Sequence, residues 1–99
     1  MRILILEDEK TIAKGIMRWL LDIYDNPNIY IVVDIDDISP HLEFEYDLAI
    51  IDFNFGFWAW SQIKSEKKLL ISGDHLGLCS YFLPKPFFKE DLIEILEKI

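Results

Sequence analysis

Short, mainly apolar runs that each end at a polar residue constrain the fold of this 99-residue chain more than any other feature. The runs lie at residues 2–6, 29–35, 48–51, 69–71 and 81–83. Apolar side chains recur at helical spacing over 10–24 and 88–99, and the segment around Ser39-Pro40 has room for a short helix. Apolar strands that alternate with helices are typical of a parallel sheet covered on both faces. The sequence therefore predicts one α/β domain over residues 1–99.

The charge balance and the single cysteine narrow the class of protein. Ten Lys and Arg side chains stand against 18 Asp and Glu, so the formal net charge is −8. Because nucleic-acid binding requires clustered basic residues, we expect no direct nucleic-acid partner. Cys79 cannot form an intrachain disulfide, and no apolar signal segment follows Met1, so we expect a reducing cytoplasm. The longest apolar stretch, 48–60, falls short of the roughly 20 residues of a membrane span.

Chemically active side chains gather where the predicted strands end. These residues are Glu7-Asp8-Glu9, Asp34 to Asp37, Asp52, Ser72 and Lys85. In an open parallel sheet, ligands bind beyond the carboxyl ends of the strands. Two carboxylates about 4 Å apart repel by about 4 kcal/mol at an effective dielectric constant near 20, so such acids either raise their pKa values or bind a divalent cation such as Mg²⁺. With a hydroxyl and an ammonium group beside them, they suit a hard cation and a phosphoryl group.

Each of these residues also has a simpler interpretation when it is taken alone. An aspartate after a strand, such as Asp8 or Asp52, is often only a helix N-cap or turn former. Ser72-Gly73 is typical of a turn, and Lys85 of a solvated surface lysine. The combination at successive strand ends therefore carries the prediction, rather than any single member.

Four segments resemble the response-regulator receiver domain of two-component phosphotransfer systems. They are Ile3-Leu4-Ile5-Leu6-Glu7-Asp8-Glu9, Leu48-Ala49-Ile50-Ile51-Asp52, Leu70-Ile71-Ser72-Gly73 and Leu83-Pro84-Lys85-Pro86-Phe87. They follow the predicted strands in the order of that family and extend over nearly the whole chain. The resemblance implies a flavodoxin-like three-layer sandwich with a five-stranded parallel sheet in the order 2-1-3-4-5. It also implies a cis peptide bond in the lysine-proline segment.

The resemblance assigns the phospho-acceptor and the metal ligands. Asp52 would bind Mg²⁺ and attack phosphorus, forming an acyl phosphate. Glu7 and Asp8 would ligate or position the metal, and the backbone carbonyl of Asn54 would complete the protein ligands.

The same resemblance assigns the groups around the phosphoryl oxygens. Ser72 would hydrogen-bond one of these oxygens, and Lys85 would supply a positive charge beside it. Ser72 and Phe82 would form the switch that responds to phosphorylation. Phe82 lacks the hydroxyl of a tyrosine, so this switch would work by packing alone.

The spacing of the motifs departs from the family in the second half of the chain. Asp52 and Ser72 are 20 residues apart, and Ser72 and Lys85 are 13 apart. Each interval is shorter than usual by roughly two or three helical turns. We therefore expect the third and fourth helices of the fold to be shortened or lost, with only 75–80 left to build the fourth. Receivers generally signal through the face that contains the fourth helix, so the usual output surface is in question.

The aromatic segment 53–60, directly after the proposed acceptor, has two interpretations. Its Phe and Trp side chains either fill volume left by the shortened helices or form an exposed anchor for a partner. The sequence leaves both open. His41 and His75 have no metal-ligand partner at a useful spacing, so we interpret them as surface or packing residues.

Three functions remain open from the sequence. The leading hypothesis is a stand-alone receiver, not a classical enzyme, that accepts a phosphoryl group on Asp52 from a histidine kinase or histidine phosphotransfer protein. It would signal by binding an unknown downstream protein or by forming a homodimer. A second hypothesis is a receiver-like interaction module that works without phosphorylation. A third rests on Ile31-Val32-Val33-Asp34-Ile35-Asp36, which resembles haloacid-dehalogenase phosphatases and would make Asp34 the nucleophile.

Overall fold

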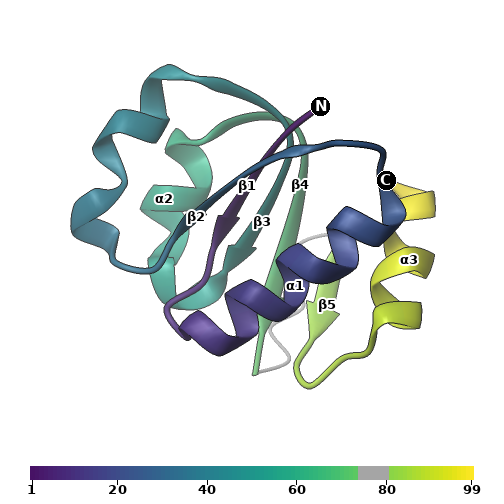
Figure 1. Ribbon diagram of the computed structural model, residues 1–99. Helices are drawn as coiled ribbons and strands as arrows, with labels where there is room; N and C mark the ends of the chain where they lie inside the picture. Colours follow the sequence, from purple (N-terminus) through teal and green to yellow (C-terminus); the bar gives the residue numbers. More distant parts are fainter. Residues whose placement is uncertain (74–80) are drawn as a thin grey trace.

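The computed structural model describes residues 1–73 and 81–99 and contains one five-stranded parallel sheet in the order β2-β1-β3-β4-β5 (Figure 1). The strands are β1 (Arg2–Leu6), β2 (Asn28–Val32), β3 (Glu45–Asp52), β4 (Lys64–Ser72) and β5 (Phe82–Pro84). The helices are α1 (Lys10–Ile23), α2 (Gly56–Gln62) and α3 (Lys89–Lys98), with 3₁₀ helices η1 (Ile35–Asp37), η2 (Ser39–Glu43) and η3 (Phe53–Phe55). The predicted fold class and strand order are confirmed. Among the described helices, none has the length and apolarity that a membrane span requires.

Two helices cover one face of the sheet. Ala13, Ile16 and Leu20 recur three and four residues apart on α1, so they form one apolar stripe, and all three are buried. On α3, Leu92 and Leu96 do the same. Both stripes pack against the strand side chains of one core cluster, which includes Ile3, Ile5, Leu48, Ile50, Leu69, Ile71 and Leu83. These strand residues alternate along each strand, as expected for one face of a sheet.

The other face of the sheet is covered by shorter helices than the first. Its core contains Leu4, Leu6, Ala49 and Ile51 from the strands, together with Ile38, Phe55, Ala59 and Ile63 from the connecting segments. Figure 1 shows α2 and the 3₁₀ segment after β2 on this side of the sheet, opposite α1 and α3. The three-layer arrangement is therefore complete, but 3₁₀ turns and a helix of seven residues build one of its layers.

Several strand boundaries differ from the sequence prediction, including the start of β3 at Glu45 instead of Leu48, and two of them show the physical reason. β4 begins at Lys64 instead of Leu69, because its polar first half pairs with β3: Lys64 lies beside Glu45, and Lys68 lies beside Ala49. β2 ends at Val32 instead of residue 35, because the chain turns into η1 after Asp34, whose Oδ1 accepts a hydrogen bond from the backbone N–H of Asp36. In both cases pairing and capping decide the end of the strand, and hydropathy alone does not report them.

The shortening of the third helix of the fold is confirmed, since α2 spans only seven residues between β3 and β4. The segment around Ser39-Pro40 forms η2, and no α-helix occurs between β2 and β3. The prediction for the fourth helix, together with His75 and Cys79, falls on residues 74–80, outside the described residues.

Candidate functional site

Three charged side chains meet at the carboxyl end of the sheet. Glu7 follows β1, Asp52 is the last residue of β3, and Lys85 follows β5. The two carboxylates come from adjacent strands, since β1 pairs with β3 over four residues. Glu7 is 0% exposed and Asp52 2%, although acidic side chains are almost never fully buried without a partner.

Lys85 is the cation that this buried pair of acids contacts. Its Nζ donates a hydrogen bond to Glu7 Oε1 at 2.6 Å and lies 3.3 Å from Asp52 Oδ1. Asp8, which is exposed, contributes a third carboxylate, and one ligand atom from each acid lies within 4.8 Å of the others. The structure thus brings together four residues that the sequence predicted to share a site.

Burial and the contacts with Lys85 together shift the pKa values of all three groups in this cluster. Loss of solvation raises the pKa of Glu7 to about 7, against the opposing effect of the hydrogen bond from Lys85. Burial also raises the pKa of Asp52, again opposed by the charge of Lys85. For Lys85, burial alone would lower the pKa, but the hydrogen bond and charge of Glu7 and the charge of Asp52 outweigh it and raise the pKa. One cation, Lys85, therefore partly neutralises both buried acids, Glu7 and Asp52.

Two oxygen atoms in the cluster lack a partner. Glu7 Oε2 and Asp52 Oδ2 are buried, and neither accepts a hydrogen bond within the described part of the chain. A buried acceptor without a partner costs stability, about 1–3 kcal/mol and more for a charged group. Carboxylate oxygens are the ligands that hard divalent cations prefer. The three acids therefore fit a Mg²⁺ ion, which would supply partners for both unpaired oxygens.

Ser72 is the last residue of β4, and Phe82 is the first residue of the neighbouring strand β5. Ser72 is buried at the end of β4, and its carbonyl oxygen accepts a hydrogen bond from the backbone N–H of Lys85 at 2.7 Å. This bond ties the loop that carries Lys85 to the sheet. The Lys85–Pro86 peptide bond is cis, as the resemblance implied. Phe82 is half-buried on β5.

Asn54 lies in η3, two residues after Asp52. It lines a hollow of about 230 Å³ together with Asp8 and Asp34. Asp34 itself is exposed and caps η1 through Oδ1, so its carboxylate stands outside the cluster of three acids. The sequence analysis grouped Asp34 with the site because it follows a strand. In the structure, its side chain instead caps the turn after β2.

The aromatic segment 53–60 is divided between core and surface. Phe55 and Ala59 are buried and belong to the core, whereas Phe57 and Trp58 remain 59% and 56% exposed. The ring of Phe57 packs edge-on against Phe53 at a centroid distance of 5.7 Å. Phe55 and Ala59 therefore fill core volume, as the first interpretation expects, whereas the role of the exposed Phe57 and Trp58 as an anchor for a partner stays a prediction.

The sequence did not identify one feature of the site, the preference of Lys85 for Glu7. The two residues are 78 positions apart, and only the order of the strands brings them together. The sequence showed only that an acid follows the first strand and a lysine follows the last. That signal indicates a common edge of the sheet, but not which carboxylate the lysine contacts.

Known structures with the same fold are numerous, although no protein-family model and no curated protein matches the chain. The chemotaxis response regulator CheY4 of Vibrio cholerae superposes with a TM-score of 0.79 at 20% identity, over 98% of this chain and 96% of that one. A CheY-like receiver domain from Methylobacillus flagellatus gives 0.77 at 22% identity, over 99% and 97%. One from Methanospirillum hungatei gives 0.73 at 19% identity, over 98% and 90%.

These matches cover nearly the full length of this chain and of the similar structures. Identity near 20% relates backbones rather than site residues, so the arrangement of Glu7, Asp52 and Lys85 stands on its own geometry. The sheet order, the cis bond after Lys85 and the acids at the ends of β1 and β3 agree with what the four sequence motifs implied. The chain has the fold of CheY-like response-regulator receiver domains.

Proposed function

We propose that this chain is a receiver that accepts a phosphoryl group on Asp52 from a phosphohistidine of a kinase or a histidine phosphotransfer protein. The observation that carries the proposal is the buried pair Glu7 and Asp52, each with one unpartnered carboxylate oxygen, held by a single lysine. The role is that of a signalling domain and not of a classical enzyme, in the reducing cytoplasm that the sequence favours.

In the proposed transfer, a carboxylate oxygen of Asp52 forms a bond to phosphorus while the bond from phosphorus to the histidine nitrogen breaks. The product is an aspartyl phosphate, and the leaving imidazole takes up a proton from solvent. Such transfer depends on neutralising charge and on in-line positioning more than on a strong base. Lys85, 3.3 Å from Asp52 Oδ1, supplies one positive charge beside the acceptor. The Ser72 hydroxyl would hydrogen-bond a phosphoryl oxygen.

Glu7, Asp8 and Asp52 would hold Mg²⁺, with the backbone carbonyl of Asn54 as a further ligand. When bound, the ion would neutralise charge on the phosphoryl oxygens and on the acids themselves. Glu7 Oε1 accepts the hydrogen bond from Lys85 and Glu7 Oε2 has no partner within the described residues, so this carboxylate could help to hold the ion without giving up Lys85. Ser72 and Phe82 would relay the change to a downstream protein or to a second copy of the chain.

The proposal is tested by the intact mass of the full chain after incubation with Mg²⁺ and acetyl phosphate. We expect one added phosphoryl group in the parent, none in Asp52→Asn, and none in the parent when EDTA replaces Mg²⁺. Asp34→Asn is the matched control and should still be modified, because Asp34 lies outside the cluster of acids. Modification of Asp52→Asn, or its loss in Asp34→Asn, would contradict the assignment.

A second function is favoured by one observation, the exposure of Phe57 and Trp58 on α2. Exposed aromatic side chains are common anchors of protein interfaces. The chain would then be an interaction module that works without phosphorylation. A folded parent chain that fails to bind Mg²⁺ at millimolar concentration would favour this function over phosphoryl transfer.

The phosphatase hypothesis loses its basis in the geometry. Its nucleophile, Asp34, is exposed after the edge strand β2 and is engaged in capping η1. The buried acids and the lysine instead surround Asp52.

A further inference from the structure

The outer edge of β2 has backbone groups without partners. Asn28 donates its N–H to the carbonyl of Met1 at 2.8 Å, and the carbonyl of Val32 accepts from the N–H of Glu7 at 3.1 Å. The backbone groups of Asn28 and Val32 therefore point toward β1. Because these groups alternate in direction along a parallel strand, those of Ile29 and Ile31 point away from the sheet. Neither residue makes an outward hydrogen bond within residues 1–73 and 81–99.

Within β2 (Asn28–Val32) this edge lacks the charged side chains and prolines that usually keep an edge strand unpaired, and Pro27 lies directly before the strand. Residues 26–33 contain no charged side chain, in a chain that is 28% charged. Ile29 and Ile31 are half-buried, and Tyr30 is 40% exposed. In Figure 1 no other segment passes in front of β2. Natural proteins normally protect such an edge with lysines, prolines, bulges or a covering element.

The first half of β4 offers a contrast at the opposite side of the sheet. The N–H of Leu70 donates to the carbonyl oxygen of Tyr81, the residue before β5, so it points away from β3. Because backbone groups alternate in direction along a strand, those of Lys64, Glu66 and Lys68 point the same way. Here the outward positions are charged. Antiparallel pairing of two copies about Glu66 would place Glu66 opposite Glu66 and Lys64 opposite Lys68. Like charges directly opposite one another destabilise such a pair, so self-pairing in this register is opposed.

We propose that β2 pairs antiparallel with β2 of a second copy, about a two-fold axis at Tyr30. Ile29 of one copy then lies opposite Ile31 of the other, and the outward N–H and C=O groups of these residues satisfy one another. Tyr30 lies opposite Tyr30, where aromatic cross-strand pairs are favourable, and Asn28 lies opposite Val32. Every residue in this register meets an uncharged partner on the same face of a sheet that continues through both copies.

The partner that best fits the β2 edge is a second copy of the same strand. The register about Tyr30 is self-complementary in hydrogen bonding and side-chain type, and a two-fold axis closes the assembly at two copies. The dimer uses no residue of the phosphoryl site, so it goes beyond the proposed function. Loss of phosphorylation and loss of association are separate experimental outcomes.

The test is sedimentation velocity of the full chain over a concentration series, without Mg²⁺ or phosphodonor. We expect a dimer whose fraction rises with protein concentration. Tyr30→Lys and Tyr30→Glu each place like charges opposite one another and should raise the dissociation constant about fivefold or more. An equal mixture of the two variants should recover the dimer, because the introduced charges are then opposite. Recovery on mixing is specific to pairing centred on Tyr30.

A backbone variant supplies an independent readout. Ile31→Pro removes one outward N–H without touching the ladder between β1 and β2, and should weaken the dimer. Glu66→Pro makes the same change on β4 and should leave association unchanged. Circular dichroism of each variant checks that it is folded. A parent that stays monomeric up to millimolar concentration, association indifferent to Tyr30 charge, or dissociation by Glu66→Pro would each overturn the proposal.

Discussion

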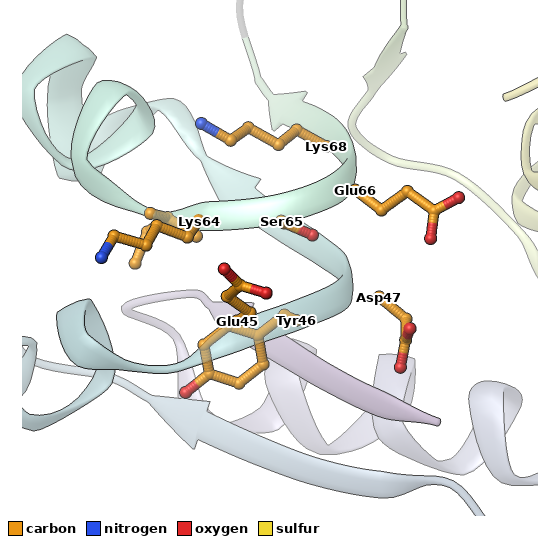
Figure 2. A pocket seen from close by; sticks show the side chains of 8 residues that line it. Glu45, Tyr46, Asp47, Lys64, Ser65, Glu66 and Lys68 are labelled. Atoms are coloured by element: carbon orange, nitrogen blue, oxygen red, sulfur yellow. The ribbon is translucent and has the colours of Figure 1, made fainter.

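Charged side chains gather at both ends of the sheet, and burial separates the two groups. At the carboxyl end, Glu7 and Asp52 are buried and share Lys85. At the amino end of β3 and β4, a larger hollow of about 600 Å³ is also lined by acids and lysines, which Figure 2 shows as separate side chains around its rim. The charged residues of that hollow are Glu45, Asp47, Lys64, Glu66 and Lys68.

The difference between these two groups shows that residue type and cavity size do not by themselves make a site. In the amino-end hollow, Glu45 and Lys64 are exposed, and none of the ion pairs found in the described residues lies there. Water screens such charges, and exposed pairs are worth about 0–1 kcal/mol. In the carboxyl-end cluster, loss of solvation raises the pKa of both buried acids. Of these two groups, only the buried cluster would be stabilised substantially by a bound cation, because its carboxylates have lost solvation.

The largest effect that separates the two ends is expected from removing one lysine. Lys85→Met leaves two buried carboxylates without their cation, and should lower the free energy of unfolding at pH 8 by about 3–5 kcal/mol. The matched variant Lys64→Met removes an exposed lysine and should change it by less than about 0.5 kcal/mol. Urea unfolding of both variants without divalent cations measures the difference. Equal losses would show that burial does not distinguish the two groups.

Metal affinity should differ between the two ends in the same direction. Glu7→Gln removes a charged ligand with a free Oε2 and should weaken Mg²⁺ binding about tenfold or more, since the ion prefers carboxylates. Glu45→Gln removes an exposed carboxylate and should leave binding unchanged. Isothermal titration with Mg²⁺ alone measures both. If Glu45→Gln weakened binding as much, the ion would have to be placed at the amino end instead.

The stability of the metal-free chain should depend on pH because of Glu7. Its pKa is about 7 when folded and near its ordinary value of 4.5 when unfolded, so between these values the folded chain binds more protons. Stability should therefore fall as pH rises from about 4.5 to about 7, and the raised pKa of Asp52 acts in the same direction. Glu7→Gln should flatten the profile in thermal unfolding. A parent profile that rises over this window would contradict the pKa of Glu7.

The smallest effect is expected at Lys68, the one half-buried charge of the amino-end hollow. Its Nζ donates to the carbonyl of Trp60 at 2.5 Å and lies 5.5 Å from the centre of the Trp60 ring. Lys68→Met should cost about 0.5–1 kcal/mol through loss of the cation–π contact. Urea unfolding measures it, and Lys67→Met, on the exposed side of β4, is the control. A cost near that of Lys85→Met would remove the contrast between the two ends.

Residues at strand ends could be placed from the sequence because parallel strands bring their carboxyl ends to one edge. This rule located Glu7, Asp52 and Lys85 in one cluster. It also brought Asp34 to the hollow that Asp8 and Asn54 line, but not into the cluster of acids, because the Asp34 side chain caps the next turn. It also missed the first half of β4, because Lys64 to Lys68 show no apolar pattern and become a strand only through pairing with β3.

The sequence by itself determined the class of fold, the strand that each site residue follows and the apolar stripes of α1 and α3. Those properties depend on local periodicity and on residue type, which a single chain displays directly. The tertiary structure decided which carboxylate Lys85 contacts, which oxygens stay without partners and which outer edge remains uncharged and open. Each of these depends on desolvation and on contacts between residues far apart in the chain, so each exists only once the sheet has formed.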